Sequence, residues 1–211
     1  MSFSNNAKFI TFEGIDGCGK STQARMLLDV LNKTHSIETI LVREPGGTTI
    51  SESIREILLH SNRGELGDRS ESLLMTASRA QLTQDVIIPN LELGKCVIAD
   101  RYSDSTLAYQ GGGRGIDIDW LIDLNNYATF ALVPDITFLI DIRPEEALRR
   151  LDQSTDRIEG EGIEFQVRVR KTYHDLAEKF QDRYVLLDGH SNIDYIQEKL
   201  LNEMKRRGII S

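Results

Sequence analysis

The sequence predicts an α/β fold in which helices cover both faces of a five-stranded parallel sheet. Short apolar runs alternate along the chain with longer amphipathic segments. Each run is apolar on almost every residue, which is typical of strands that are buried on both faces, and therefore of parallel sheets. No internal repeat, linker or low-complexity tract divides the 211 residues, so we expect a single domain over residues 1–211.

The expected elements follow one another in strand–helix order. The apolar runs predict strands at residues 9–12, 39–42, 96–99, 136–140 and 184–187. The amphipathic patterns predict helices near residues 20–33, 50–60, 70–92, 117–127, 144–151, 164–179 and 193–206. Ligands of such sheets bind outside the carboxyl ends of the strands. The polar motifs that directly follow the expected strands are therefore the candidates for a functional site.

Composition argues against several classes of function. The formal net charge is -8, whereas a general nucleic-acid binder carries a basic surface. No apolar run is long enough to span a membrane, and residues 1–8 lack the pattern of a signal peptide. The two cysteines, Cys18 and Cys96, have no metal-ligand spacing and suit a reducing compartment. We therefore expect a cytoplasmic protein with neither a nucleic-acid nor a membrane partner.

A phosphate-binding loop follows the first expected strand. The segment Gly14-Ile15-Asp16-Gly17-Cys18-Gly19-Lys20-Ser21 matches the pattern G-x-x-x-x-G-K-[ST] in full. The glycines let several backbone N–H groups point at one phosphate, and the helix that opens at about Lys20 adds its positive end. Lys20 is expected to reach the β- and γ-phosphates, and Ser21 to ligate Mg²⁺. The loop indicates a P-loop nucleotide-binding protein, without distinguishing a kinase from a GTPase or a motor.

Further polar motifs follow the other strands. Asp100, at the end of a buried strand, occupies the place where P-loop proteins hold the shell of their Mg²⁺. Arg101 comes next, and its guanidinium can grip a phosphate with two N–H groups, although a structural salt bridge is an alternative role for this pair. The remaining motifs are Arg43-Glu44-Pro45-Gly46-Gly47-Thr48, then Arg55, then Leu73-Leu74-Met75-Thr76-Ala77-Ser78-Arg79, and finally Asp156-Arg157-Ile158-Glu159.

The sequence resembles the thymidylate kinase family, especially its bacterial branch, in five segments that occur in the family's order. These segments are FEGIDGCGKST, REPGGT, LLMTASR, DRYSDSTLAYQGGGRG and DRIE. The resemblance covers almost the whole chain. It implies a P-loop NTPase fold with a mobile lid at about residues 150–162. It also implies a homodimer that uses ATP and Mg²⁺ to phosphorylate dTMP to dTDP, a step of dTTP biosynthesis.

The resemblance further implies a role for each matching residue. Arg55 and Arg101 hold the acceptor phosphate, Tyr109 lies against the deoxyribose, and Asp16 faces the sugar 3′-hydroxyl and the metal. A loop-bracing role for Asp16 and a core role for Tyr109 are the alternatives.

The implied ATP-binding residues are Gly14, Ile15, Asp16, Gly17, Cys18, Gly19, Lys20, Ser21 and Thr22, with adenine expected near Asp188-Gly189. The implied dTMP-binding residues are Glu44, Arg55, Met75, Arg79, Arg101, Ser105, Thr106, Tyr109 and Gln110, of which Arg79, Ser105, Thr106 and Gln110 read the base. The implied catalytic residues are Lys20, Arg101, Arg157 and Asp16, and the implied metal ligands are Ser21, Asp16 and Asp100.

The sequence departs from the family pattern at two places. Met75 stands where the family usually has a phenylalanine that stacks on thymine, which predicts weaker stacking. The second departure is in the lid, where residues 151–155 lack the additional arginine that many bacterial relatives carry, which leaves the identity of the lid arginine open. The phosphate loop has Gly17 and no arginine before Cys18, so the resemblance to the bacterial branch implies that the lid supplies the catalytic arginine. We expect Arg157 in this role, then Arg150; Arg149 is a further candidate, and a solvated helix end is the alternative for the last two.

Other functions predict different features. A P-loop kinase for another nucleotide, such as dUMP, is the nearest alternative, whereas a nucleoside acceptor would leave Arg55 and Arg101 without a phosphate to hold. A GTPase switch predicts an N-K-x-D motif, but the only Asn-Lys pair is followed by Thr34 and His35. An ATP-driven nucleic-acid motor is disfavoured by the acidic charge and the short chain.

Overall fold

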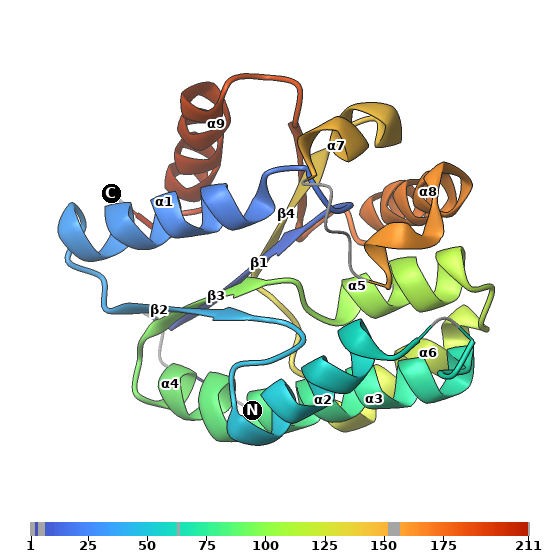
Figure 1. Ribbon diagram of the computed structural model, residues 1–211. Helices are drawn as coiled ribbons and strands as arrows, with labels where there is room; N and C mark the ends of the chain where they lie inside the picture. Colours follow the sequence, from blue (N-terminus) through green and yellow to red (C-terminus); the bar gives the residue numbers. More distant parts are fainter. Residues whose placement is uncertain (1–2, 4–6, 63, 152–156, 211) are drawn as a thin grey trace.

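The computed structural model describes residues 3, 7–62, 64–151 and 157–210. One sheet contains five strands in the order β2-β3-β1-β4-β5, and every neighbouring pair is parallel (Figure 1). The strands are β1 (Lys8–Glu13), β2 (Thr39–Arg43), β3 (Cys96–Asp100), β4 (Ile136–Asp141) and β5 (Tyr184–Asp188). The predicted fold class is thereby confirmed. The chain leaves β1 toward β2 on one side and later crosses to β4 on the other, so a crevice opens at the carboxyl ends beside β1.

Each strand extends one residue beyond the predicted carboxyl end, onto a charged residue. These residues are Glu13, Arg43, Asp100, Asp141 and Asp188. The apolar run marks the part of the strand that is covered by helices, whereas the hydrogen-bonded ladder continues to the edge of the sheet. Because the strands are parallel, all of these ends lie on the same edge.

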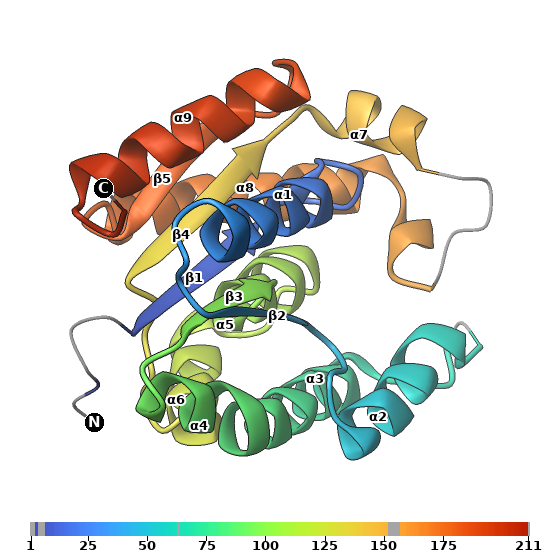
Figure 2. The same cartoon turned by 90° about the vertical axis from the view of Figure 1, so that its left-hand side faces the viewer.

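Helices cover the sheet on both faces, as Figures 1 and 2 show from two sides. Successive side chains of β3 point to opposite faces of the sheet, so they pack against different layers of helices. Ile98 packs in a cluster that contains Leu27 of α1, whereas Val97 packs in one that contains Leu82 of α3. The helical elements are α1 (Lys20–Lys33), α2 (Thr49–His60), α3 (Asp68–Leu82), η1 (Thr83–Ile87), α4 (Ile88–Glu92), α5 (Ser103–Thr106), η2 (Leu107–Gly113), α6 (Ile118–Ala128), α7 (Pro144–Arg150), η3 (Glu159–Glu161), α8 (Ile163–Lys179) and α9 (Ile193–Arg206). Among the described residues, no helix has the length and apolar character that a membrane crossing needs.

The helical patterns are confirmed, and two helical segments were not predicted: residues 103–113 and the short 3₁₀ turn η3. The single pattern near residues 70–92 is a continuous run of α3, η1 and α4 with a π-turn in its middle. The segment after β3 also folds into a helix, α5 followed by η2, and ends in three glycines. A Cβ atom at Gly112 would lie 1.9 Å from Oγ1 of Thr172, and one at Gly113 would lie 2.4 Å from Cε2 of Phe165. These glycines therefore allow η2 to pack directly on α8.

Candidate active site

A cavity of about 210 Å³ lies at the carboxyl ends of β1, β2 and β3. Every residue predicted to bind the acceptor lines it, together with predicted residues of the phosphate loop and Asp100. The predicted residues in its wall are Asp16, Lys20, Ser21, Glu44, Arg55, Met75, Arg79, Asp100, Arg101, Ser105, Thr106, Tyr109 and Gln110. We call this space the acceptor cavity. Its wall also includes Arg43, which was not predicted.

A second cavity, of about 680 Å³, lies on the other side of the phosphate loop. We call it the donor cavity, and its wall contains residues 17–22 of the loop and the start of α1. Gly189 and residues 191–193, after β5, line it as well, and Gly189 belongs to the expected adenine site at Asp188-Gly189. Lys20 and Ser21 line both cavities. Two ligands can therefore meet at one lysine and one hydroxyl.

The phosphate loop owes its curled shape to glycine. Gly14 and Gly17 have φ of 139° and 78°, values that other residues rarely adopt. A Cβ atom at Gly17 would lie 2.4 Å from the carbonyl oxygen of Ala147. Cys18 is buried in the loop, and burial raises the pKa of its thiol; burial likewise raises the pKa of Cys96, in β3, to about 12. Both cysteines are free and sit in the core.

Arg101, Asp16 and Tyr109 form a compact polar cluster in the acceptor cavity. Nη2 of Arg101 lies 2.5 Å from Oδ1 of Asp16 and donates to the Tyr109 hydroxyl at 3.0 Å, and that hydroxyl donates to Asp16 at 2.7 Å. Arg101 has a left-handed φ of 74°. Burial alone would raise the pKa of Asp16, but the charges of Arg101 and Lys20 outweigh burial and hold it well below its ordinary value. Asp16 is therefore ionised.

A buried carboxylate that the sequence did not single out lies beneath Arg101. Glu13 accepts hydrogen bonds from the backbone N–H of Tyr102 at 2.8 Å, from Ser105 Oγ at 2.6 Å and from the Tyr173 hydroxyl at 2.8 Å. Burial, followed by the charge of Asp104, raises the pKa of Glu13 to about 7. Ser105 and Tyr173 also contact Arg101, at 3.1 Å and 3.4 Å. Glu13 therefore holds the strained turn that presents Arg101.

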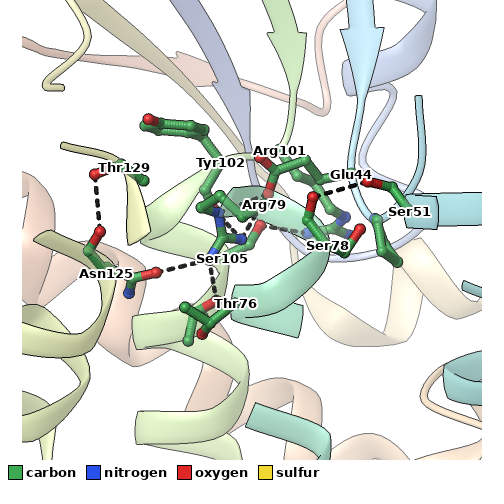
Figure 3. A network of polar contacts seen from close by, with 12 residues as sticks. Glu44, Ser51, Thr76, Ser78, Arg79, Arg101, Tyr102, Ser105, Asn125 and Thr129 are labelled. Carbon is green, nitrogen blue, oxygen red and sulfur yellow. Dashed lines mark hydrogen bonds and ion pairs between the residues drawn. The ribbon is translucent and has the colours of Figure 1, made fainter. Parts of the chain in front are cut away.

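Arg79, which was predicted to read the base, is bound within the protein (Figure 3). Its Nε and Nη2 contact Glu44 Oε2 at 2.7 Å and 2.6 Å. Its other N–H groups donate to Thr106 Oγ1, to Asn125 Oδ1 and to the Tyr102 carbonyl, at 2.6, 2.7 and 2.9 Å. All five N–H groups of the guanidinium are thus engaged. Arg79 lines the acceptor cavity, but in this structure it fixes the wall and has no spare donor.

Comparison with known proteins decides the family. The family model for thymidylate kinase matches residues 12–200, and the chain is 49% identical over 189 residues to the thymidylate kinase of Thermosipho africanus, which covers 89% of this chain and 92% of that one. The chain belongs to the thymidylate kinase family. A thymidylate kinase of Chlorobium phaeobacteroides is 44% identical over 209 residues, 94% of each chain. The crystal structure of thymidylate kinase from Ehrlichia chaffeensis matches with a TM-score of 0.79 and 35% identity, over 94% of this chain and 98% of that one.

The two leading lid arginines of this thymidylate kinase family member lie apart. Arg150 lines the donor cavity and donates to the carbonyl of Gly189 at 3.1 Å. Arg157 instead lies 2.7 Å from Oε2 of Glu71 and donates to the carbonyl of Leu58 at 3.0 Å, with its side chain nearly buried. It lines neither cavity described above. Residues 152–156 of the predicted lid, including Asp156, lie outside the described residues.

The predicted metal ligands of this thymidylate kinase family member lie together. Ser21 Oγ donates a hydrogen bond to Asp100 Oδ2, and both residues line the acceptor cavity with Asp16. Ser21, Asp100 and Asp16 offer only oxygen atoms as metal ligands, which suits a hard cation such as Mg²⁺. Within the described residues, no group of three His, Cys, Asp or Glu side chains gathers for a metal.

Proposed function

We propose that this protein transfers the γ-phosphoryl group of ATP to dTMP and forms dTDP, a step in the synthesis of dTTP. The observation that carries the proposal is the junction of the two cavities at Lys20 and Ser21, in a chain of the thymidylate kinase family. Phosphoryl transfer needs the donor phosphate and the acceptor oxygen to be held in line, with their charge neutralised. A junction between a phosphate loop and a second cavity supplies that arrangement.

ATP is assigned to the donor cavity. Backbone N–H groups of residues 17–22 and the start of α1 present positive partial charge there, and Lys20 adds a full charge at the junction. Arg150, Gly189 and residues 191–193 form the part of the wall away from the loop, and we assign the adenine to that part.

dTMP is assigned to the acceptor cavity, with its phosphate beside Arg101 and Arg55. Arg55 donates to the carbonyl of Pro45 at 2.9 Å, which holds it at the cavity wall. Two arginines offset the repulsion between the dTMP dianion and ATP, and their fork-shaped donors orient the attacking oxygen. The sugar then lies against Tyr109, and the base extends toward Met75 and Gln110.

Mg²⁺ is the cofactor that this donor set suits, and Ser21, Asp100 and Asp16 are the residues that would hold it. When bound with ATP, Mg²⁺ neutralises charge on the β- and γ-phosphates. The protein's own contribution at this point is to keep Ser21 and Asp100 side by side, through the pairing of β3 with β1. Lys20, 3.6 Å from Asp16, lies at the junction of the two cavities, beside the transferring group.

We also propose that the protein acts as a homodimer in the cytoplasm. Large apolar side chains are exposed on three adjoining helices: α2, α3 and α6 (Figures 1 and 2). They are Ile50, Ile57, Leu73, Trp120 and Tyr127. A second copy of the chain would remove this apolar surface from water. Sedimentation of wild type against Leu73→Glu tests the dimer, because a charge on this face should dissociate it. The free cysteines support a reducing compartment.

The test of the activity is a coupled ADP-release assay with ATP and Mg²⁺. The acceptors to compare are dTMP, dUMP, UMP, CMP, AMP, GMP and thymidine. A preference for dTMP, with UMP and thymidine poor, is the expected result. Turnover of another acceptor and none of dTMP would keep a P-loop kinase but overturn the assignment of the acceptor cavity.

A further inference from the structure

Glu71 is a buried carboxylate behind the acceptor cavity, and no step proposed above uses it. It lies on α3, and its side chain is 1% exposed. Met75 and Arg79 follow at intervals of four residues, so the three side chains share one face of the helix. The other two line the acceptor cavity. Glu71 therefore lies on the helix face that forms the cavity wall, one helical turn before Met75 in the chain.

Three side chains surround the Glu71 carboxylate. Nε2 of Gln110 donates to its Oε1 at 2.9 Å. Arg114 donates through Nε to Oε1 at 3.2 Å and through Nη2 to Oε2 at 3.0 Å, and Arg157 approaches Oε2 at 2.7 Å. Burial alone would raise the pKa of Glu71, but the hydrogen bonds from Arg114 and Gln110 hold it below its ordinary value. The carboxylate is thus ionised and is only an acceptor of hydrogen bonds.

This carboxylate determines which way the Gln110 amide points. An ionised carboxylate has no proton to give, so Gln110 must turn its NH₂ group toward Glu71. The carbonyl oxygen of Gln110 then remains for another donor. Among the described residues no hydrogen bond to that oxygen is present, although Gln110 is 2% exposed and lines the acceptor cavity. The wall of the acceptor cavity therefore contains an oriented hydrogen-bond acceptor that no described residue uses.

We propose that Glu71 is a specificity-determining positioning residue, which fixes the Gln110 amide so that its carbonyl oxygen accepts the N3–H of a 2,4-dioxopyrimidine base. Thymine and uracil carry that N–H, whereas cytosine has a lone pair at N3. A cytosine base would place two acceptors against each other and leave both unpaired, which is a strong basis for rejection. This proposal rests on the proposed function, because it requires a nucleotide base in the acceptor cavity.

Glu71→Gln tests the proposal with little change of shape. The new amide can present either its oxygen or its NH₂ group to Gln110, so the Gln110 amide is free to turn. We expect the ratio of kcat/KM for dTMP to that for dCMP to fall about tenfold, a change that corresponds to one hydrogen bond. The KM for ATP should stay the same. The matched control is Arg114→Gln, which removes an ion pair of Glu71 but keeps the Gln110 contact, and it should leave the ratio within about twofold.

Two further variants separate positioning from a general structural role. Gln110→Ala should lower the ratio by itself, and Glu71→Gln should lower it no further in that background. A structural role would instead affect both substrates alike in both backgrounds. Glu71→Asp keeps the charge but withdraws the carboxylate from Gln110, so it should shift the ratio in the same direction if Glu71→Gln does not fold.

The proposal is overturned if wild type prefers dTMP and folded Glu71→Gln or Glu71→Asp retains the full ratio. It is also overturned if Glu71→Gln lowers the ratio equally with and without Gln110. A wild type that does not phosphorylate dTMP overturns the proposed function and this inference together, so the two failures are distinguishable.

Discussion

Nη2 of Arg101 lies 2.5 Å from Oδ1 of Asp16, so the cation assigned to the acceptor phosphate is neutralised by an acid of the phosphate loop. The same guanidinium donates to the carbonyl of Gly14 at 3.1 Å. Arg101 therefore couples the acceptor cavity to the loop that holds ATP, and a substrate phosphate must share it with Asp16.

Arg101→Ala should lower kcat/KM for dTMP by about 100-fold or more, because a bidentate contact that orients the acceptor and stabilises charge is lost. Steady-state kinetics at saturating ATP measure the effect. Arg101→Lys is the control, since it keeps the charge but loses the fork of donors, and it should recover only part of the activity. Unchanged kinetics in the alanine variant would show that Arg101 does not bind the acceptor phosphate.

Glu13 predicts a dependence of stability on pH. Its pKa is raised from an ordinary value of 4.5 to about 7, so its contribution to stability is fully present below pH 4.5 and is lost as pH rises to about 7. As the pH rises from 4.5 to 7, the free energy of unfolding of wild type should therefore fall relative to that of Glu13→Gln, by about 3 kcal/mol as an upper bound. Urea unfolding at several pH values measures the difference. Glu164→Gln, on an exposed part of α8, is the control and should follow wild type; parallel curves for Glu13→Gln and wild type would contradict the assignment.

The lid arginine can be identified by separate alanine variants. Arg157→Ala should lower kcat far more than KM, because its contact with the transferring group forms mainly in the transition state. In this structure Arg157 is paired with Glu71 and must leave it to act. If kcat survives in Arg157→Ala and falls in Arg150→Ala, the catalytic arginine is Arg150. Arg149→Ala, at an exposed helix end, tests the third candidate and should retain the kcat of wild type.

Met75→Phe should lower the KM for dTMP by about two- to tenfold, which corresponds to the energy of an aromatic pair. Met75 lines the acceptor cavity and packs against the core, so a ring there can reach the base. Met75→Leu keeps a similar volume without a ring and should leave KM unchanged. A phenylalanine variant with the KM of wild type would show that stacking does not limit binding at this site.

The strands and most helices could be predicted from the sequence because burial leaves a local pattern. The charged residue that ends each strand could not, since its place in the ladder depends on the neighbouring strand. Thus Asp100 pairs with Phe12 of β1 and with Arg43 of β2. The helix of residues 103–113 was also missed, because its polar residues and glycines are selected by contacts with the cavity and with α8.

The members of the site were predictable as a set, whereas their partners were not. Most residues of the motifs line one cavity, but the donors of Arg79 are taken up by Glu44 and Asn125, which lie 35 and 46 residues away in the chain. Glu13 and Glu71 were missed because each acts through a contact with a distant segment. A partial signal existed for Glu71, since it stands one helical turn before Met75.

Because both thiols are buried, the rates at which they are labelled report how often the structure around each of them opens. A reagent such as iodoacetamide can modify Cys18 or Cys96 only when the surrounding core opens and the thiolate forms. Labelling of Cys18 thus measures how often the phosphate loop opens, and labelling of Cys96 measures how often the centre of the sheet opens. A nucleotide bound at the loop should slow the first rate more than the second, so the two rates distinguish ligand protection of the loop from stabilisation of the whole fold.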